Sequence, residues 1–285
     1  MRPAADQPSG PQSLRLLNLG CGKRFHPDWV NVDIAPQGAS VIRCDLSRGI
    51  PFPEDSFDAV YHSNVLEHIR REHGSAFIRE CWRVLRPGGI LRVAVPDLEQ
   101  ICRIYLEKLE RADAGDKEAV AEYDWMLLEL FDQTVRERSG GGMTEHLRQN
   151  PVPGESFVLE RIGAEGRDLL KAIRAQARSG QKTPVRPWRA VRKSLRQILA
   201  RLFFGKQASK ALEIGRFRLA GEVHQWMYDR FSLGRLMEDN GFACPTLMTP
   251  QTSRIAGWSG YHLEVAPDGR VHKPDSFVME CEKPE

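Results

Sequence analysis

The residues of this chain that are best suited to chemistry follow the ends of apolar segments. Leu16 to Gly22 reads LLNLGCG, an apolar strand that runs into a turn with two glycines. Eleven residues after Gly22, Asp33 closes a second apolar segment. Glycines let the backbone approach a ligand without a Cβ, and an acid at the end of the next strand accepts hydrogen bonds from ribose hydroxyls. This spacing predicts a nucleoside site at the edge of a parallel sheet.

The turn favours a nucleoside ligand without a pyrophosphate. A dinucleotide site has a third glycine at the start of a helix, whereas here Lys23 and Arg24 follow Gly22. S-adenosylmethionine (SAM) carries ribose and adenine but no phosphate, so we predict SAM as the ligand. We expect Asp33 to bind its ribose and Asp45, after a short third strand, to contact its adenine. The residues expected to bind the cofactor are Asn18, Gly20, Cys21, Gly22, Asp33, Asp45, Leu46, Ser63 and Asn64.

A sheet must position these residues. Apolar runs bounded by turn residues predict strands over 14–19, 29–34, 40–43, 56–62 and 90–95. A helix is expected between the last two of these strands, ending at Gly88 and Gly89. This alternation of strands and helices predicts an α/β fold with a parallel sheet.

The motifs that begin at Asp45 resemble those of class I SAM-dependent methyltransferases. The type-11-like group, associated with bacterial cell-surface polysaccharide and natural-product pathways, has the pattern DxxxLPFxDxSFDxV, then LEH, then RVLxPGG. With few departures, this chain reads DLSRGIPFPEDSFDAV from Asp45, LEH from Leu66 and RVLRPGG from Arg83. The resemblance covers residues 14–97 and resumes more weakly at 222–283.

The resemblance implies a Rossmann-like sheet of seven strands with the last strand reversed. It also implies SAM as the methyl donor and S-adenosylhomocysteine as the product. The family usually has an acid at the position of Asn18, which here can accept a hydrogen bond from the methionine ammonium only as a neutral group.

Four segments are expected along the chain. They are a polar tail over 1–12, a SAM-binding half over 13–97, a helical and basic insertion over 98–222, and the C-terminal half of the core over 223–285. The insertion follows the fifth strand, where elements that cover an acceptor belong.

In the last segment we expect one helix and three strands. The helix is predicted over Ser232 to Asn240, with Ser232 as its N-cap. The sixth strand is predicted over 243–248, and an antiparallel pair over 261–265 and 277–281.

Three residues are candidates for the chemical step. Methyl transfer from a sulfonium to an alcohol is an in-line displacement that needs a base for the hydroxyl proton, and histidine is the usual base near neutral pH. His224, beside Trp226 and Tyr228, is the preferred base, with Asp97 and His146 as further candidates. Each also has a structural interpretation: a buried, hydrogen-bonded histidine, or an N-cap for a helix after Asp97.

A metal is not expected at Glu67 and His68. In the ubiquinone-pathway O-methyltransferases that the chain resembles, an acid, an acid three residues on and then a histidine bind a divalent metal. The first of these positions is Asn64 here. We therefore expect no metal and activity that survives chelation, with His68 packed or capping near the cofactor.

Charge is distributed unevenly along the chain. The net charge is only +3, but residues 167–218 contain fifteen Lys and Arg against two acids. Apolar residues fall on one face of a helix predicted over 188–204, and basic residues cover the other face. This helix suits peripheral contact with an anionic membrane, or equally a packed helix with a solvated face. Nucleic acid is a less favoured partner, because no known binding module accompanies the charge.

The bulk composition excludes several classes of protein. No run of about 18 apolar residues is present to span a membrane. The six cysteines include no CxxC pair, which favours reduced thiols in the cytoplasm, with a peripheral position on the inner face of the membrane as an option.

We therefore predict a SAM-dependent O-methyltransferase acting on a sugar or glycan hydroxyl, with a lipid-linked acceptor as one form. The first alternative is N- or O-methylation of a small natural product. The second is a SAM-fold protein that binds a membrane or an anionic partner with little catalysis. The oligomeric state is not predicted.

Overall fold

The computed structural model describes residues 14–179, 203 and 205–285. At its centre is a seven-stranded sheet in the order β3-β2-β1-β4-β5-β7-β6. The strands are β1 (Leu16–Leu19), β2 (Trp29–Asp33), β3 (Val41–Arg43), β4 (Phe57–Ser63), β5 (Leu85–Pro96), β6 (Ala243–Met248) and β7 (Ser276–Glu282). The first five strands are parallel, and β7 runs antiparallel to both of its neighbours. The predicted fold class, a Rossmann-like sheet with a reversed last strand, is confirmed.

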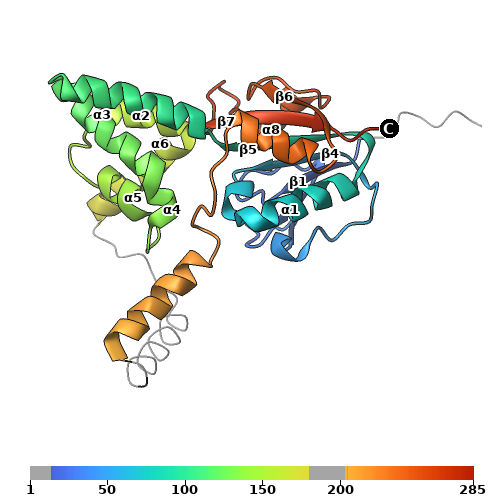
Figure 1. Ribbon diagram of the computed structural model, residues 1–285, viewed down its shortest axis with the longest axis horizontal. Helices are drawn as coiled ribbons and strands as arrows, with labels where there is room; N and C mark the ends of the chain where they lie inside the picture. The colour runs from blue at the N-terminus through green and yellow to red at the C-terminus, as the bar shows by residue number, and fades with distance from the viewer. Residues whose placement is uncertain (1–13, 180–202, 204) are drawn as a thin grey trace, which may run out of the picture.

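Alternate side chains of the strands pack on opposite faces of this sheet. On one face, Leu17 and Leu19 share a core with residues of α1 (Arg71–Val84) and α8 (Arg230–Glu238). These two helices lie on the same side of the sheet (Figure 1). On the other face, Leu16 packs near Trp258 of α9 (Trp258–Tyr261). Both faces are therefore buried, as a parallel sheet requires.

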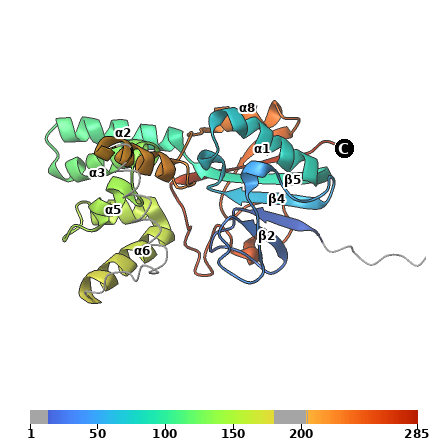
Figure 2. The same ribbon diagram turned by 90° about the horizontal axis from the view of Figure 1, so that it is seen from below.

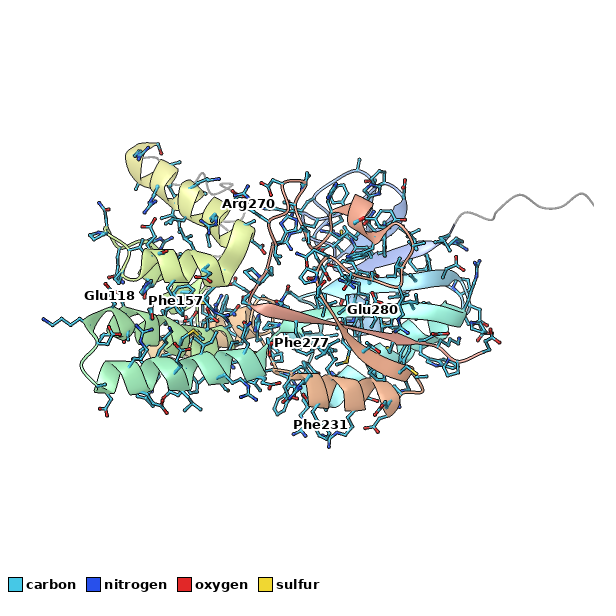
Figure 3. All side chains as sticks on the ribbon, turned by 90° about the horizontal axis from the view of Figure 1, so that it is seen from above. Glu118, Phe157, Phe231, Arg270, Phe277 and Glu280 are labelled. Carbon is cyan, nitrogen blue, oxygen red and sulfur yellow. The ribbon has the colours of Figure 1, made fainter. Side chains whose placement is uncertain are left out.

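A helical unit follows the end of β5 and lies beside the sheet (Figures 1 and 2). It comprises α2 (Leu98–Asp113), α3 (Lys117–Leu127), a π-helical turn (Leu128–Asp132), α4 (Gln133–Val135), α5 (Gly141–Leu147) and α6 (Glu155–Ser179). Trp125, Met126 and Val158 form its own core. Phe157 of α6 packs against this core, with the Lys108 ammonium 5.2 Å from its ring centre (Figure 3). Residues 205–218 form a further helix.

The helix α6 is interrupted where it meets the segment before β7. Gly163 adopts a φ of +62°, and a Cβ there would lie 2.3 Å from Pro274 Cδ. Only glycine permits this approach, because both the backbone conformation and the available space exclude a side chain. The contact joins the helical unit to the sheet domain beside Lys273.

Two predicted elements of the C-terminal segment differ in the structure. The helix predicted from Ser232 begins at Arg230 instead, because Asp229 is its N-cap. Ser232 sits three residues later and completes a capping box by accepting the Asp229 N–H at 3.0 Å. The strand predicted over 261–265 is wrong: Tyr261 ends α9, and only an isolated bridge joins Val265 to Val271. The terminal antiparallel pair is formed by β6 and β7.

Candidate active site

A cavity of about 510 Å³ opens at the carboxyl ends of β1, β2 and β4. Residues predicted to bind the cofactor line it from three strand ends: Asn18, Gly20, Cys21, Gly22, Asp33, Ser63 and Asn64. The volume lies within the range of about 300–1,000 Å³ that is typical of small-molecule sites. The structure therefore places most of the predicted cofactor residues around one space.

The glycine loop is held by the strand that follows it. Gly20 and Gly22 have φ angles of +63° and +53°. The Gly22 N–H donates to Asp33 Oδ2 at 2.8 Å, and the Cys21 N–H donates to Val32 O at 3.1 Å. The Asn18 amide donates to Asn31 Oδ1 at 3.1 Å. The loop is thus fixed in position by backbone and side-chain bonds to β2 and its end.

The residues present fit SAM. A Cβ built on Gly22 meets no atom of the described residues within 4 Å, so the loop backbone is open on that side. The Asp33 carboxylate lines the cavity at the end of β2, where a ribose would be bound. Cys21 is a small lining residue, and burial raises the pKa of its thiol to about 11, which opposes a nucleophilic role.

Asp45 and Leu46 are not among the residues that line the cavity. The Asp45 side chain caps the 3₁₀ helix Leu46–Arg48, accepting bonds from the N–H and hydroxyl of Ser47. Hydrogen bonds from Ser47 lower the pKa of this carboxyl. Ala35 and Gln37 line the cavity after β2. The structure gives Asp45 a local capping role, and its contact with adenine stays a prediction.

The cavity lining also contains a cluster of three ionisable side chains, which we call the acceptor-end cluster: Glu67, His68 and His224. Glu67 and His68 belong to the 3₁₀ helix Leu66–His68 that follows β4. The rings of His68 and His224 lie 4.8 Å apart at an angle of 84°. The Gln225 N–H donates to the Glu67 backbone carbonyl at 2.6 Å, which holds the chain around His224 against this helix.

Burial governs the charge of this cluster. Glu67 is 0% exposed, and burial raises its pKa to about 7. His224 is 5% exposed, and burial, reinforced by His68, lowers its pKa to about 2. Burial also lowers the pKa of His68. Among the described residues, neither carboxylate oxygen of Glu67 nor Nδ1 of His224 has a hydrogen-bond partner.

Of the three predicted catalytic residues, His224 is the one that lines the cavity. Asp97 is the N-cap of α2, and its Oδ1 accepts the Gln100 N–H at 3.0 Å. His146 is buried in the helical unit, with Nε2 2.8 Å from the Pro153 carbonyl oxygen. Asp97 is thus a helix N-cap, and His146 is a buried, hydrogen-bonded histidine. These are the structural interpretations that the sequence offered as alternatives to a catalytic role.

Four lining residues that come from distant segments were not predicted from the sequence. Gln133, Arg136, Glu222 and Lys273 also line the cavity. The Arg136 guanidinium forms ion pairs with the carboxylates of Asp132, at 2.9 Å, and Glu222, at 3.3 Å. The spacing of Asp132 and Arg136, four residues apart on a helix, was the one local signal available.

Comparisons with known proteins match part of this chain to methyltransferases. Residues 17–93 match the family model described as a methyltransferase domain. A Mycolicibacterium smegmatis protein described as a "Probable S-adenosylmethionine-dependent methyltransferase" is 30% identical over 99 residues, covering 29% of this chain and 38% of the relative. A Parvibaculum lavamentivorans ubiquinone biosynthesis O-methyltransferase is 28% identical over 104 residues, covering 29% and 40%. The matches thus span less than half of these relatives.

Among solved structures, the chain is similar to 1,6-didemethyltoxoflavin-N1-methyltransferase of Burkholderia thailandensis bound to S-adenosylhomocysteine. The identity is 10% and the TM-score 0.37, covering 95% of this chain and 72% of that one. The domain match supports the predicted methyltransferase domain over residues 17–93. Within the described residues, no helix is long and apolar enough to cross a membrane.

Asp33→Ala is expected to weaken SAM binding about ten- to a hundredfold. The change removes a charge-assisted hydrogen bond to ribose, worth about 1.5–3 kcal/mol, and the acceptor that holds the Gly22 N–H. Isothermal titration calorimetry measures the affinity. Asp33→Asn keeps an acceptor oxygen without the charge, so its SAM affinity is expected to lie between that of the wild type and that of Asp33→Ala. Wild-type affinity in a folded Asp33→Ala protein would contradict the ribose assignment.

Proposed function

We propose that the protein is a SAM-dependent O-methyltransferase whose acceptor is a sugar or glycan hydroxyl. The observation that carries this proposal is the shared cavity. Its lining includes both the glycine loop with Asp33 and the acceptor-end cluster. A donor and an acceptor bound in one space can react in line without diffusing apart.

Different residues of the cavity bind the methyl donor and the acceptor. SAM, when bound, supplies an electrophilic methyl group on a positively charged sulfur. The loop backbone and Asp33 bind the nucleoside part, and the acceptor-end cluster faces the hydroxyl that receives the methyl group. His224 has an unpartnered ring nitrogen, Nδ1, that suits a hydrogen bond from this hydroxyl and holds its oxygen for attack.

The polar lining supports a hydroxyl-rich acceptor. Gln133, Arg136, Glu222 and Lys273 bring amide, guanidinium, carboxylate and ammonium groups to the cavity. Each of these groups can donate a hydrogen bond to a sugar hydroxyl or accept one from it. The small-molecule alternative is supported by the Parvibaculum relative, whose name places it in ubiquinone biosynthesis.

The lipid-linked form of the acceptor and the membrane contact belong to the same proposal. Residues 188–202 and 204 of the predicted basic helix lie outside the described residues. The described helix over 205–218 carries four basic residues against one acid, which supports an anionic surface as its neighbour. A cytoplasmic position, peripheral on the membrane, stays a prediction.

Transfer of a labelled methyl group tests the function. Purified protein and SAM labelled in the methyl group are incubated with nucleotide sugars, with oligosaccharides and with phenolic small molecules. We expect micromolar SAM binding by calorimetry and label in the saccharide products. Label confined to phenolic products would favour the small-molecule alternative. Binding of SAM without transfer to any cell-extract fraction would favour the binding protein, and no SAM binding would overturn the enzyme.

A further inference from the structure

Lys273 is a cationic side chain of the cavity whose charge is only partly matched within the fold. It precedes β7 and lies outside the residues that match the methyltransferase domain. Its side chain is 26% exposed and lines the cavity, and its Nζ lies 3.9 Å from Asp275 Oδ2. That distance is too long for a hydrogen bond. Within the part of the chain that the structure describes, the N–H donors of this ammonium therefore have no acceptor.

The other lysines and arginines that line the cavity are paired or exposed. The Arg24 guanidinium forms an ion pair with Glu165 of α6. Arg136 has two carboxylate partners of its own, as described above. Lys23 is exposed. Lys273 is thus the lining cation best suited to bind an anionic group of a ligand.

The ammonium of Lys273 interacts with both the glycine loop and the acceptor-end cluster. Burial alone lowers the pKa of a lysine, but nearby carboxylates, first among them Asp275, raise the pKa of Lys273 above its ordinary value. Glu67 of the cluster contributes to this rise, and Arg24, which follows the glycine loop, opposes it. The ammonium is therefore charged at neutral pH, in the cavity that receives both the donor and the acceptor.

An acceptor for a second ligand group is present on β1. Asn18 is 1% exposed and lines the cavity. Its Nδ2 donates to Arg24 O and to Asn31 Oδ1, both at 3.1 Å, so both of its N–H donors are used. No described residue donates to Asn18 Oδ1, which is left to accept a hydrogen bond from a ligand. The methionine part of SAM carries one ammonium and one carboxylate, so its site needs both an acceptor and a cation.

Resting on SAM as the cofactor of the proposed function, we propose that Lys273 binds the carboxylate of SAM and that the cavity thereby selects cofactors that carry this group. A charge-assisted hydrogen bond from an ammonium to a carboxylate is roughly twice as strong as a bond between neutral groups. The carboxylate takes one or two of the three N–H donors, and the rest can still bind an acceptor hydroxyl. The residue that recognises the carboxylate thus comes from outside the matched residues 17–93.

The segment around Lys273 is held from two sides. The N–H groups of residues 164 and 165 on α6 donate to the backbone carbonyls of residues 271 and 272, at 3.3 and 3.4 Å. On the other side, the Asp97 N–H donates to the Asp275 backbone carbonyl at 3.0 Å. The backbone that carries the ammonium is therefore ordered by the fold, which lowers the entropy cost of binding.

The test compares SAM with decarboxylated SAM, a probe that keeps the sulfonium and the ammonium but lacks the carboxylate. Isothermal titration calorimetry on the full chain measures both affinities. We expect the wild type to bind SAM at least tenfold more tightly than the probe, which corresponds to about 1.4 kcal/mol. Lys273→Met is expected to bind SAM at least tenfold more weakly than the wild type does, and the probe within about twofold of the wild type.

Two control variants accompany this comparison. Lys273→Arg keeps the charge and is expected to retain a preference for SAM over the probe. Lys171→Met removes a lysine of α6 that is 73% exposed and does not line the cavity, so it is expected to keep the wild-type preference. Binding of the probe at wild-type affinity shows that a variant is folded, and Lys273→Gln replaces Lys273→Met if the latter does not fold.

Three results would overturn the inference. A wild type that binds both ligands equally has no carboxylate site, and unchanged SAM affinity in Lys273→Met would exclude this lysine from the site. Equal weakening of both ligands in the variant would make Lys273 a structural residue. The proposed function fails separately: a wild type that prefers SAM over the probe but transfers no methyl group would overturn the enzyme and leave the role of Lys273 intact.

Discussion

Replacing Arg92 with methionine is expected to lower the free energy of unfolding by about 3–5 kcal/mol. Arg92 lies on β5 and is 0% exposed. Its guanidinium donates to Glu264 and Glu280 and to the backbone carbonyls of Thr249 and Thr252. Removing the arginine would leave the buried Glu264 carboxylate without its cation, and Glu280 with Arg254 alone, whose Nε lies 3.5 Å away.

The hydrogen bonds of Arg92 form a network that joins β5 to segments outside the strands. Glu280 is on β7 (Figure 3), and Glu264 belongs to the segment after α9. The guanidinium also lies 4.1 Å from the ring centre of Trp258, which covers this face of the sheet. Loss of Arg92 therefore removes interactions both with β7 and with the segment around Trp258 that packs on this face of the sheet.

Urea denaturation monitored by circular dichroism measures this loss. Arg103→Met is the matched control, because Arg103 is 73% exposed and pairs with Glu99 on the surface of α2, so its loss should cost less than about 1 kcal/mol. Arg92→Met combined with Glu264→Gln and Glu280→Gln should recover part of the stability, since the unpaired charges are then removed. A loss below about 1 kcal/mol in Arg92→Met alone would show that the network is not buried as described.

The sequence predicted the cofactor end of the cavity because its signals are local. Gly20, Gly22 and Asp33 lie within fourteen residues, and each performs a backbone or strand-end role that its residue type requires. The strand starting at Ile90 was predicted too short, because Pro87 and the glycines at 88 and 89 indicated a turn. In the structure β5 begins at Leu85, with an irregular register against β4 at this point.

The acceptor end was less predictable because its residues come together only in the folded chain. His224 was singled out by residue type, but its proximity to Glu67 and His68 depends on how the insertion returns to the sheet. Lys273 had no local signal at all. Asp97 followed a strand end as a catalytic acid would, yet the same position also suits an N-cap, and the N–H of Gln100 is its partner in the structure. Arg92 was likewise hidden in an apolar run.

Gly20→Ala is expected to weaken SAM binding at least a hundredfold, which corresponds to about 2.7 kcal/mol. The residue has a φ of +63°, where a side chain costs about 1–2 kcal/mol. An added Cβ would also lie 2.5 Å from Val65 Cγ2, which is a steric clash, so one of the two groups must move. Val65 packs against the core of the sheet and has a stiff, β-branched side chain, so the glycine loop must move instead. Calorimetry with SAM measures the effect.

Two further variants separate the contact with Val65 from backbone strain. Gly22 has a similar φ of +53°, but a Cβ there meets no atom within 4 Å, so Gly22→Ala without ligand should lose only the strain energy of about 1–2 kcal/mol. Thermal unfolding should therefore show a smaller loss for Gly22→Ala than for Gly20→Ala. Val65→Ala removes the obstructing methyl group, so the double variant Gly20→Ala/Val65→Ala should bind SAM more tightly than Gly20→Ala, a non-additivity typical of residues in contact. If Gly20→Ala retains wild-type SAM affinity, this loop is not the one that approaches the cofactor.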